Sequence, residues 1–244
     1  MITKYHRPLA LDDAIALAAR SDAVIIAGGT TVNADPGRTP VVAVDLQALE
    51  LSGIETDGES VRIGSMTRLA DIVESALAPS VLRDLARRDA PNTIRNAATI
   101  GGTIGTADAE SQLLTGLLAF GAIVTLAGAD STTTRPLKEI LDDTQILRGT
   151  IITSVAIPSN GLAAADRTAR TPMDQPIVMA VAHRDGDGAV VLAMAGVAPR
   201  PVIVEPDRIG DLDPPSDFRG SSRYRTQIAS VLASRVLARV AVGK

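Results

Sequence analysis

Two glycine pairs, each followed directly by threonine, are the residues of this sequence best suited to chemistry. Gly28-Gly29-Thr30 follows an apolar run at 23–27, and Gly101-Gly102-Thr103 lies within the stretch TIRNAATIGGTIGTA at 93–107. Glycine lacks a Cβ and tolerates positive φ, so successive N–H groups at such a pair can point at one anion. Together the segments predict a phosphate cradle, with threonine hydroxyls as further donors. Either pair alone is more typical of an ordinary turn.

Other chemical motifs are few. Neither glycine pair matches G-x-G-x-x-G or G-x-x-x-x-G-K-[ST], so the sequence indicates neither a Rossmann nor a P-loop site. Asp108 and Glu110 are a candidate carboxylate pair and Arg95 a candidate phosphate ligand, but solvated or packed roles are more typical of such residues. His6 and His183 are expected to be structural and at the surface, respectively. We therefore predict no catalytic residue and no metal ligand, so any chemistry belongs to a bound cofactor.

Composition excludes several classes of function. The chain has no cysteine, which rules out disulfides, thiolate nucleophiles and cysteine-ligated iron–sulfur clusters within it. A net charge of −4 and an aromatic content of 2% give no basis for nucleic-acid binding. No apolar run approaches the roughly 18 residues of a membrane span, and the N-terminus lacks the apolar core of a signal peptide. We expect a cytoplasmic protein.

The first part of the chain, 1–52, is predicted to be a small α/β unit. Its expected elements are a helix at 10–19, strands at 23–27 and 41–46, and an intervening loop at 28–40. The second part, 53–158, is predicted to begin with a hairpin turning at Asp57-Gly58. It continues with helices at 68–76 (capped by Thr67), 79–88 and 111–120, strands at 122–126 and 150–157, and a short turn or helix at 136–141.

A linker is predicted at 159–165, before a third part at 166–244. Strands at 177–183 and 190–196 are separated by Asp185-Gly186-Asp187-Gly188, which is typical of a hairpin turn. A loop rich in proline, aspartate and glycine follows at 199–217. Apolar residues at helical spacing predict a final helix over 221–242.

With these motifs in order, the chain resembles the FAD-binding medium subunit of molybdenum hydroxylases, the group that includes carbon monoxide dehydrogenase and xanthine dehydrogenase. The likeness covers nearly the whole chain. IRNAATIGG at 94–102 is its most specific segment, and IIAGGTT at 25–31 resembles the other cofactor loop. The opening KYHRPLALDDAIALAA, the stretch AVDLQALELSGIETDGESVRIGSMTRLADI and the C-terminal segments MDQPIVMAVA, AMAGVAPRPV and SSRYRTQIASVLASRVL carry the rest.

The resemblance implies an α+β fold with a two-subdomain FAD-binding fold of the vanillyl-alcohol-oxidase (PCMH) type, at 1–52 and 53–158, and a small C-terminal α+β domain at 166–244. It implies that FAD lies between the subdomains, with its pyrophosphate held by both glycine segments. Gln112 stands where the family has an aspartate that hydrogen-bonds the FAD ribose. The cofactor-binding residues carried over are Ala27, Gly28, Gly29, Thr30, Thr31, Thr99, Ile100, Gly101, Gly102, Thr103, Thr106 and Gln112.

The resemblance also implies partners: a molybdopterin-binding large subunit and a small subunit with [2Fe-2S] clusters, assembled as a dimer of heterotrimers. Electrons would pass through the clusters to FAD and on to an external acceptor (NAD, a quinone or oxygen). Thr103 replaces the family's asparagine and Gln112 its aspartate. These departures keep open a flavin-free structural subunit of the same complex, and a stand-alone flavoenzyme of the wider fold is a third alternative. The substrate is set by the molybdenum subunit, which is another chain.

Overall fold

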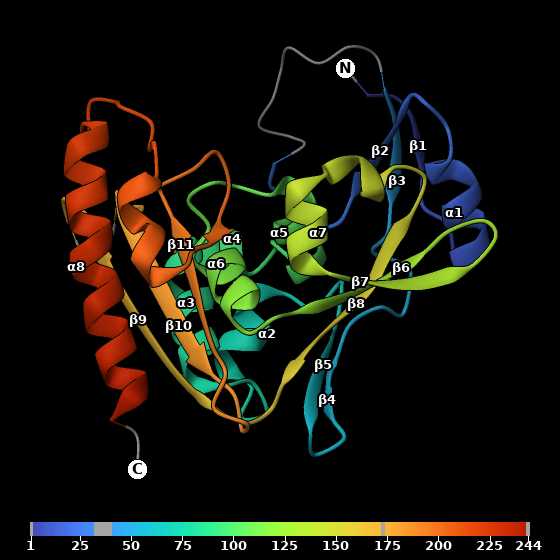
Figure 1. Cartoon of the computed structure of the whole chain (residues 1–244). Helices are drawn as coiled ribbons and strands as arrows, with labels where there is room; N and C mark the ends of the chain where they lie inside the picture. Colours follow the sequence, from blue (N-terminus) through green and yellow to red (C-terminus); the bar gives the residue numbers. More distant parts are fainter. Residues whose placement is uncertain (1, 32–40, 172–173, 243–244) are drawn as a thin grey trace.

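The computed structural model describes residues 2–31, 41–171 and 174–242, and it contains three β-sheets with helices packed between and around them (Figure 1). The first sheet is parallel, in the order β1-β3-β2, and helix α1 packs on it. Its elements are β1 (Ile2–His6), α1 (Leu11–Ala18), β2 (Ala23–Ile26) and β3 (Val41–Asp45). The part of the predicted loop at 32–40 lies outside the described residues.

The second sheet is antiparallel and has the order β4-β5-β8-β6-β7. The predicted hairpin is confirmed: Gly58 has φ of 94°, and the Asp57 carboxylate accepts hydrogen bonds from the N–H groups of Glu59 and Ser60. Its strands are β4 (Ile54–Thr56), β5 (Ser60–Gly64), β6 (Ile123–Ala127), β7 (Thr132–Pro136) and β8 (Ile151–Pro158).

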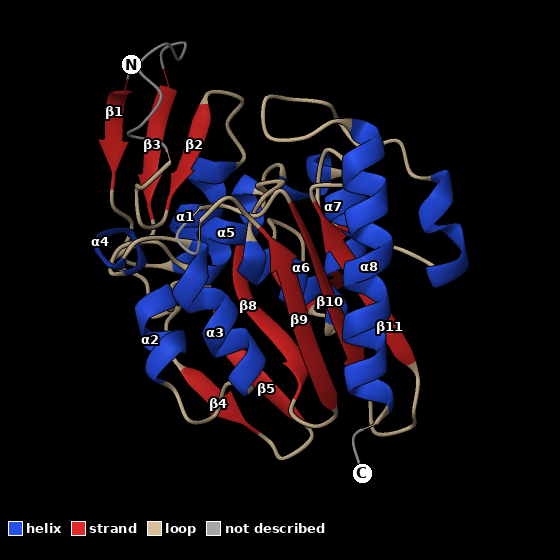
Figure 2. Ribbon diagram, turned by 90° about the vertical axis from the view of Figure 1, so that its left-hand side faces the viewer, coloured by secondary structure: helices blue, strands red, loops and turns tan. Residues whose placement is uncertain are grey.

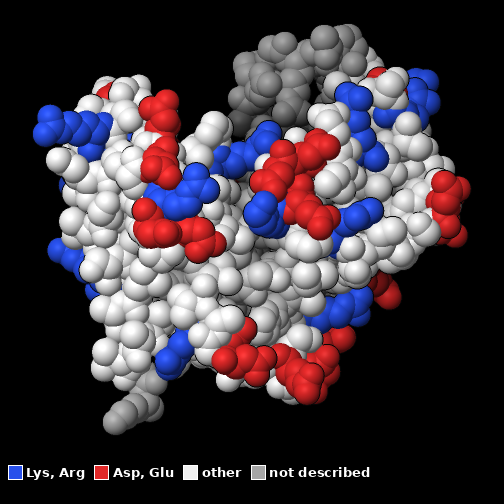
Figure 3. Space-filling model, in the orientation of Figure 1, with Lys and Arg blue, Asp and Glu red and all other residues white. Residues whose placement is uncertain are grey.

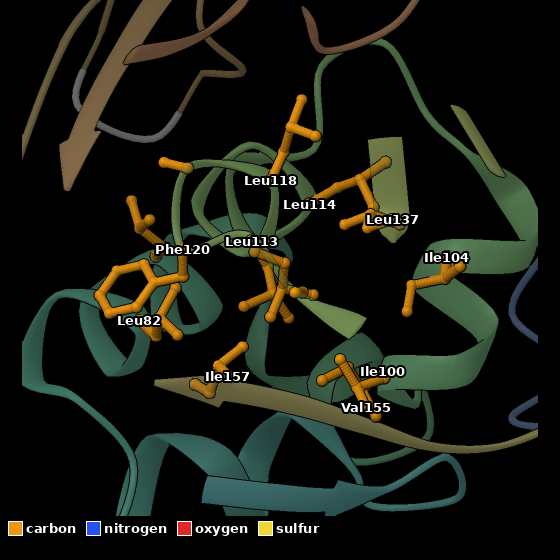
Figure 4. Packing of buried hydrophobic residues seen from close by; sticks show 14 of the residues in the cluster. Leu82, Ile100, Ile104, Leu113, Leu114, Leu118, Phe120, Leu137, Val155 and Ile157 are labelled. Atoms are coloured by element: carbon orange, nitrogen blue, oxygen red, sulfur yellow. The ribbon is translucent and has the colours of Figure 1, made fainter. Parts of the chain in front are cut away.

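Helices between and beside the sheets carry most of the core. α6 is buried along its whole length, because it packs on the second sheet and on the third. Leu113, Leu114 and Leu118 of α6 meet Ile100 of α5 and Val155 of β8 in one cluster (Figure 4). The elements are α2 (Leu69–Glu74), α3 (Ser80–Asp89), α4 (Asn92–Arg95), α5 (Ile100–Thr106), α6 (Gln112–Ala119), α7 (Leu137–Asp142) and the 3₁₀ turn η2 (Thr144–Leu147).

The third sheet is antiparallel, in the order β12-β11-β10-β9, and α8 covers the face away from α6 (Figure 2). β10 is buried on both faces, which explains its continuous apolar sequence. Met179 and Val181 point to the α6 cluster, whereas Val178 and Ala180 pack with α8. The elements are β9 (Leu162–Thr168), β10 (Val178–Arg184), β11 (Val190–Ala195), β12 (Val202–Ile203), the 3₁₀ turn η3 (Pro206–Asp211) and α8 (Ser222–Ala241).

Two local predictions are wrong. The predicted linker at 159–165 overlaps strand β9, which begins at Leu162 and pairs with β10 along its length. Thr67 does not cap α2, whose N-cap is Arg68; the Thr67 hydroxyl instead bonds both backbone groups of Gly53, at 2.9 and 3.0 Å. The division of the chain into three domains stays a prediction.

Among the described residues, neither the surface charge nor the helices point to a particular partner. On the face shown in Figure 3, acidic and basic side chains lie in small mixed groups rather than in one extended field of a single sign. No helix within the described ranges is long and apolar enough to cross a membrane.

Candidate functional site

A cavity of about 700 Å³ lies where the first two sheets meet the segment before β10. Residues Ala23–Ile25 of the edge strand β2 line one wall, and α5 lines another. Gln175, which precedes β10, contributes from the third part of the chain. The volume falls within the range typical of sites for small molecules and cofactors.

The cavity brings together ten of the twelve predicted cofactor-binding residues. Ile100 and Gln112 are the two that do not line it. Ile100 is fully buried in the core, and Gln112 is fully buried with its Nε2 donating to the Arg88 carbonyl at 2.9 Å. The ten that line the cavity are Ala27, Gly28, Gly29, Thr30, Thr31, Thr99, Gly101, Gly102, Thr103 and Thr106.

The first glycine pair is required by the backbone itself. A Cβ at Gly28 would lie only 1.9 Å from the Ala97 carbonyl oxygen, so only glycine lets this turn approach the chain that leads into α5. Gly29 has φ of 70°, a left-handed conformation that favours glycine. The close approach at Gly28 therefore joins the two glycine segments into one wall.

The second glycine pair differs from the prediction. Gly101 and Gly102 lie in the first turn of α5, and their N–H groups already have protein acceptors: Ser65 O at 2.8 Å and Thr99 Oγ1 at 3.1 Å. The first N–H groups of a helix have no partner within it, and here the 64–67 segment and the Thr99 cap supply partners. A cradle of free N–H groups at 101–103 was therefore the wrong expectation.

Hydrogen-bond donors for a ligand come instead from the first segment and from hydroxyls. In the described part of the chain, the N–H groups of Gly28, Gly29, Thr30 and Thr31 have no hydrogen-bond acceptor. Thr99, which caps α5, and Thr106 at its end add hydroxyl groups, whereas the Thr103 hydroxyl already donates to the Thr99 carbonyl oxygen at 3.2 Å. Backbone donors for a ligand therefore lie on one side of the cavity, at the 28–31 turn, because the first N–H groups of α5 already have acceptors.

The other predicted candidates have structural roles. Asp108 lines the cavity and is exposed, whereas Glu110 forms an ion pair with Arg219, so the two acids do not act as a pair. Arg95 donates to the carbonyls of Arg87 and Ala90, both at 2.7 Å, and thereby caps the end of α3. The phosphate role for Arg95 has no support in this geometry.

His183 is not a surface residue, as the sequence suggested, but is buried. Its ring stacks on Phe120 with centroids 4.1 Å apart, and its Nε2 lies 3.2 Å from the Asn160 carbonyl oxygen. Burial lowers the pKa of His183. The charged residues that follow it, Arg184 and Asp185, made His183 look exposed in the sequence. In the structure the end of α6 covers this face of the strand.

Two of the cavity residues that sequence reasoning missed, Asp89 and Gln175, are bonded to each other. Asp89, the last residue of α3, lines the cavity, and its Oδ1 accepts hydrogen bonds from Ser111 Oγ and the Leu113 N–H, both at 2.9 Å. Burial raises the pKa of Asp89. Gln175 lines the cavity too, and its Nε2 donates to the Asp89 carbonyl at 3.0 Å. Asp89 follows two arginines in the sequence and looked like part of a solvated helix end.

Comparison with known proteins agrees with this geometry. Residues 1–160 match the family model described as the FAD binding domain in molybdopterin dehydrogenase. The chain is 30% identical to the uncharacterized protein YgfM of Escherichia coli K12, over 98% of this chain and 96% of YgfM. It is 27% identical to the carbon monoxide dehydrogenase medium chain of Afipia carboxidovorans, over 96% and 95% of the two chains.

Among solved structures, the fold matches a chain of the Cu,Mo-containing CO dehydrogenase in its cyanide-inactivated form. The TM-score is 0.88 at 25% identity, covering 98% of both chains. The fold and the cavity together define an FAD-binding protein with an α+β fold of the PCMH type. The chain belongs to the family of FAD-binding domains of molybdopterin dehydrogenases, the medium subunits of molybdenum hydroxylases, and FAD is its cofactor.

Proposed function

We propose that this chain holds FAD in the cavity and passes electrons from the [2Fe-2S] clusters of a partner subunit to an external acceptor. The cavity itself carries the proposal: it joins a donor-rich glycine turn to α5 in a chain of this FAD-binding family. FAD supplies the redox chemistry when bound. The absence of cysteine places any iron–sulfur cluster on another chain.

The chain's own residues bind and orient the cofactor. The N–H groups of residues 28–31 donate to the pyrophosphate, and the hydroxyls of Thr99 and Thr106 add hydrogen bonds from the two ends of α5. The Thr103 hydroxyl donates to the Thr99 carbonyl oxygen and steadies the first turn of the helix. Gly101 lets α5 approach Ser65 closely, because a Cβ there would lie 2.8 Å from the Ser65 carbonyl oxygen. Ile100 and Gln112 support the cavity wall without lining it. Ile100 anchors α5 in the core, and Gln112 holds the end of α3 through the Arg88 carbonyl.

The partners in this proposal are a molybdopterin-binding large subunit and a [2Fe-2S] small subunit, in a dimer of heterotrimers in the cytoplasm. The names of several relatives support a multi-subunit assembly. They include medium chains of carbon monoxide dehydrogenase and a subunit of the 6-hydroxypseudooxynicotine dehydrogenase complex of Paenarthrobacter nicotinovorans, which is 29% identical over 89% of this chain and 86% of that protein. The substrate would then be set by the large subunit.

An absorption spectrum tests the proposal. The full chain, purified alone and co-expressed with its genomic neighbours, is expected to show bound flavin or to acquire it from added FAD. In the complex, substrate should bleach the flavin absorption, whereas the isolated chain should not respond to substrate. A chain that binds no FAD in either form would overturn the proposal.

A flavin-free structural subunit is the second candidate. Two observations favour it: the N–H groups of Gly101 and Gly102 are already bonded, and Gln112 does not line the cavity. Full turnover by a complex that contains this chain but no flavin would establish this alternative.

A stand-alone flavoenzyme has less support. The described lining of the cavity contains no histidine, lysine, arginine or tyrosine, and its ionisable groups are Asp89 and Asp108. Substrate oxidation by the isolated chain would be required to revive it.

A further inference from the structure

Asp89 is an acid in an unexpected place. It ends α3, where the helix dipole disfavours negative charge, and it lies half-buried in the cavity wall. Its Oδ1 accepts from Ser111 Oγ and the Leu113 N–H, so the carboxylate sits at the N-terminus of α6, where negative charge is favoured. The Gln175 amide holds the Asp89 carbonyl from the other side. The start of α6 thus fixes the side chain of Asp89, and Gln175 fixes its backbone.

Its hydrogen bonding leaves capacity for a ligand. The hydrogen bonds from Ser111 and Leu113 both end on Oδ1, and an ionised carboxylate has about four lone-pair sites over its two oxygens. Asp108, the other acid of the described lining, is exposed to solvent and accepts from the Glu110 N–H. Of the two, only Asp89 is shielded enough for its charge to matter strongly to a bound molecule.

The position of Asp89 along the cavity limits what it can meet. The donor-rich turn at 28–31 lies near the N-terminal end of α5, because Gly28 packs against the backbone of Ala97 and Ala98. α5 then runs about 10 Å to Thr106, and the chain reverses at Ala107 before reaching Ser111, the partner of Asp89. A carboxylate repels phosphate but accepts hydrogen bonds from hydroxyls, and two vicinal hydroxyls match its two oxygens.

We propose that Asp89 is a cofactor-binding residue that accepts hydrogen bonds from a vicinal diol of FAD, about one helix length from the pyrophosphate. The inference rests on the proposed function, because it takes FAD to occupy this cavity. FAD carries such hydroxyls in its adenosine ribose and in its ribityl chain, and the chemistry at Asp89 is the same for both. Asp89 would thereby bind the FAD hydroxyls, a role that Gln112 cannot have because it does not line the cavity.

The matched variant is Asp89→Asn in the full-length chain. The asparagine Oδ1 keeps the hydrogen bonds from Ser111 and Leu113, while the Oδ2 position becomes an NH₂ donor that cannot accept from a hydroxyl. FAD affinity, followed by quenching of flavin fluorescence, is expected to fall about 10- to 100-fold. Asp108→Asn is the control at the exposed acid and is expected to change affinity less than threefold.

Two FAD analogues identify the hydroxyls without relying on a variant. One lacks the 2′-hydroxyl of the adenosine ribose, and the other lacks the 3′-hydroxyl of the ribityl chain, which belongs to both vicinal diols of that chain. The wild-type chain is expected to bind one of them at least tenfold more weakly than FAD, and Asp89→Asn should lose that discrimination. The analogue affected tells which diol Asp89 meets.

The outcomes separate this inference from the proposed function. If the wild-type chain binds no FAD, the proposed function fails. If it binds FAD but Asp89→Asn retains full affinity, or both analogues bind as tightly as FAD, only the role of Asp89 is overturned. An equal loss in Asp108→Asn would show a general effect of charge and would likewise overturn the specific contact.

Discussion

Three glycines that line the cavity would tolerate a side chain very differently. A Cβ at Gly28 would collide with backbone, at 1.9 Å from the Ala97 oxygen. At Gly102 the nearest atoms would be Thr99 Oγ1 at 3.2 Å and the Ala27 Cβ at 3.8 Å, and at Gly105 no atom would lie within 4 Å. Substitutions at these three positions can therefore distinguish an effect on the packing of the cavity wall from an effect on ligand binding.

Gly102→Val is predicted to weaken FAD binding at least tenfold while the fold is retained. The valine methyl groups would enter the gap between Thr99 and Ala27, at the wall against which we propose that FAD binds, and glycine at 102 needs no positive φ. Flavin fluorescence titration measures the affinity, and circular dichroism checks the fold. Gly105→Ala is the control: it should keep FAD affinity and stabilise the apoprotein by up to about 1 kcal/mol. Unchanged affinity in Gly102→Val would contradict the placement of FAD here.

His183 gives the stability a defined pH dependence. Its pKa is lowered by burial in the folded chain, whereas the unfolded chain has the ordinary value of about 6.5. As pH falls below about 6.5, the unfolded state takes up a proton that the folded state does not, so stability falls until the folded pKa is reached. This residue contributes a slope of at most about 1.4 kcal/mol per pH unit.

The variant His183→Gln removes that slope. Free energies of unfolding in urea, measured between pH 5 and 7, should depend less on pH in His183→Gln than in the wild type. The variant is also expected to be less stable at pH 7, because the stacking on Phe120 is lost. An unaltered pH dependence would mean that His183 is accessible to protons in the folded chain.

At the scale of elements, local turn chemistry was predictable and non-local support was not. The hairpin at Asp57-Gly58 was predicted because its conformation follows from its own residues. The segment 100–106 was not recognised as a helix, since three glycines in seven residues disfavour one. It forms because the Thr99 cap and the 65–67 backbone satisfy its first N–H groups. Strand β9 was missed for a similar reason: its alanines gain their conformation from pairing with β10.

The contact between the turn at Gly28 and residues 97–98 is predicted to be needed for folding of the wall. Gly28→Ala places a methyl group against backbone atoms, which cannot move aside by changing a side-chain rotamer. We expect the substitution to destabilise the fold by about 2–3 kcal/mol. Urea unfolding of the apoprotein measures it. The same substitution at Gly105, where the space is open, serves as the comparison. Wild-type stability in Gly28→Ala would show that the two segments can separate freely.

At the scale of the whole molecule, buried polar links hold α8 to the third sheet. Arg225 of α8 is almost fully buried, donates to the carbonyls of Ile177 and Gly196, and forms an ion pair with Asp217 at 2.8 Å. The Arg225 guanidinium holds the pKa of Asp217 well below its usual range. The apolar spacing of 221–242 predicted the helix but gave no sign of this arginine, because the two carbonyls that it bonds follow or precede strands far away in the sequence.

The cavity draws its walls from all three parts of the chain, so FAD is predicted to stabilise the molecule as one unit. β2, α5 and Gln175 all line it, and Gln175 also binds the Asp89 backbone. At free FAD one hundred times the dissociation constant, binding to the folded state alone adds about 2.7 kcal/mol. For a chain of this size that corresponds to a rise in Tm of roughly 5–10 °C. Differential scanning calorimetry should show a single transition that moves upward with FAD in the wild type and less so in Gly102→Val. Two transitions, of which FAD moves only the one belonging to residues 2–158, would show that the third sheet folds independently and that Gln175 contributes nothing to binding.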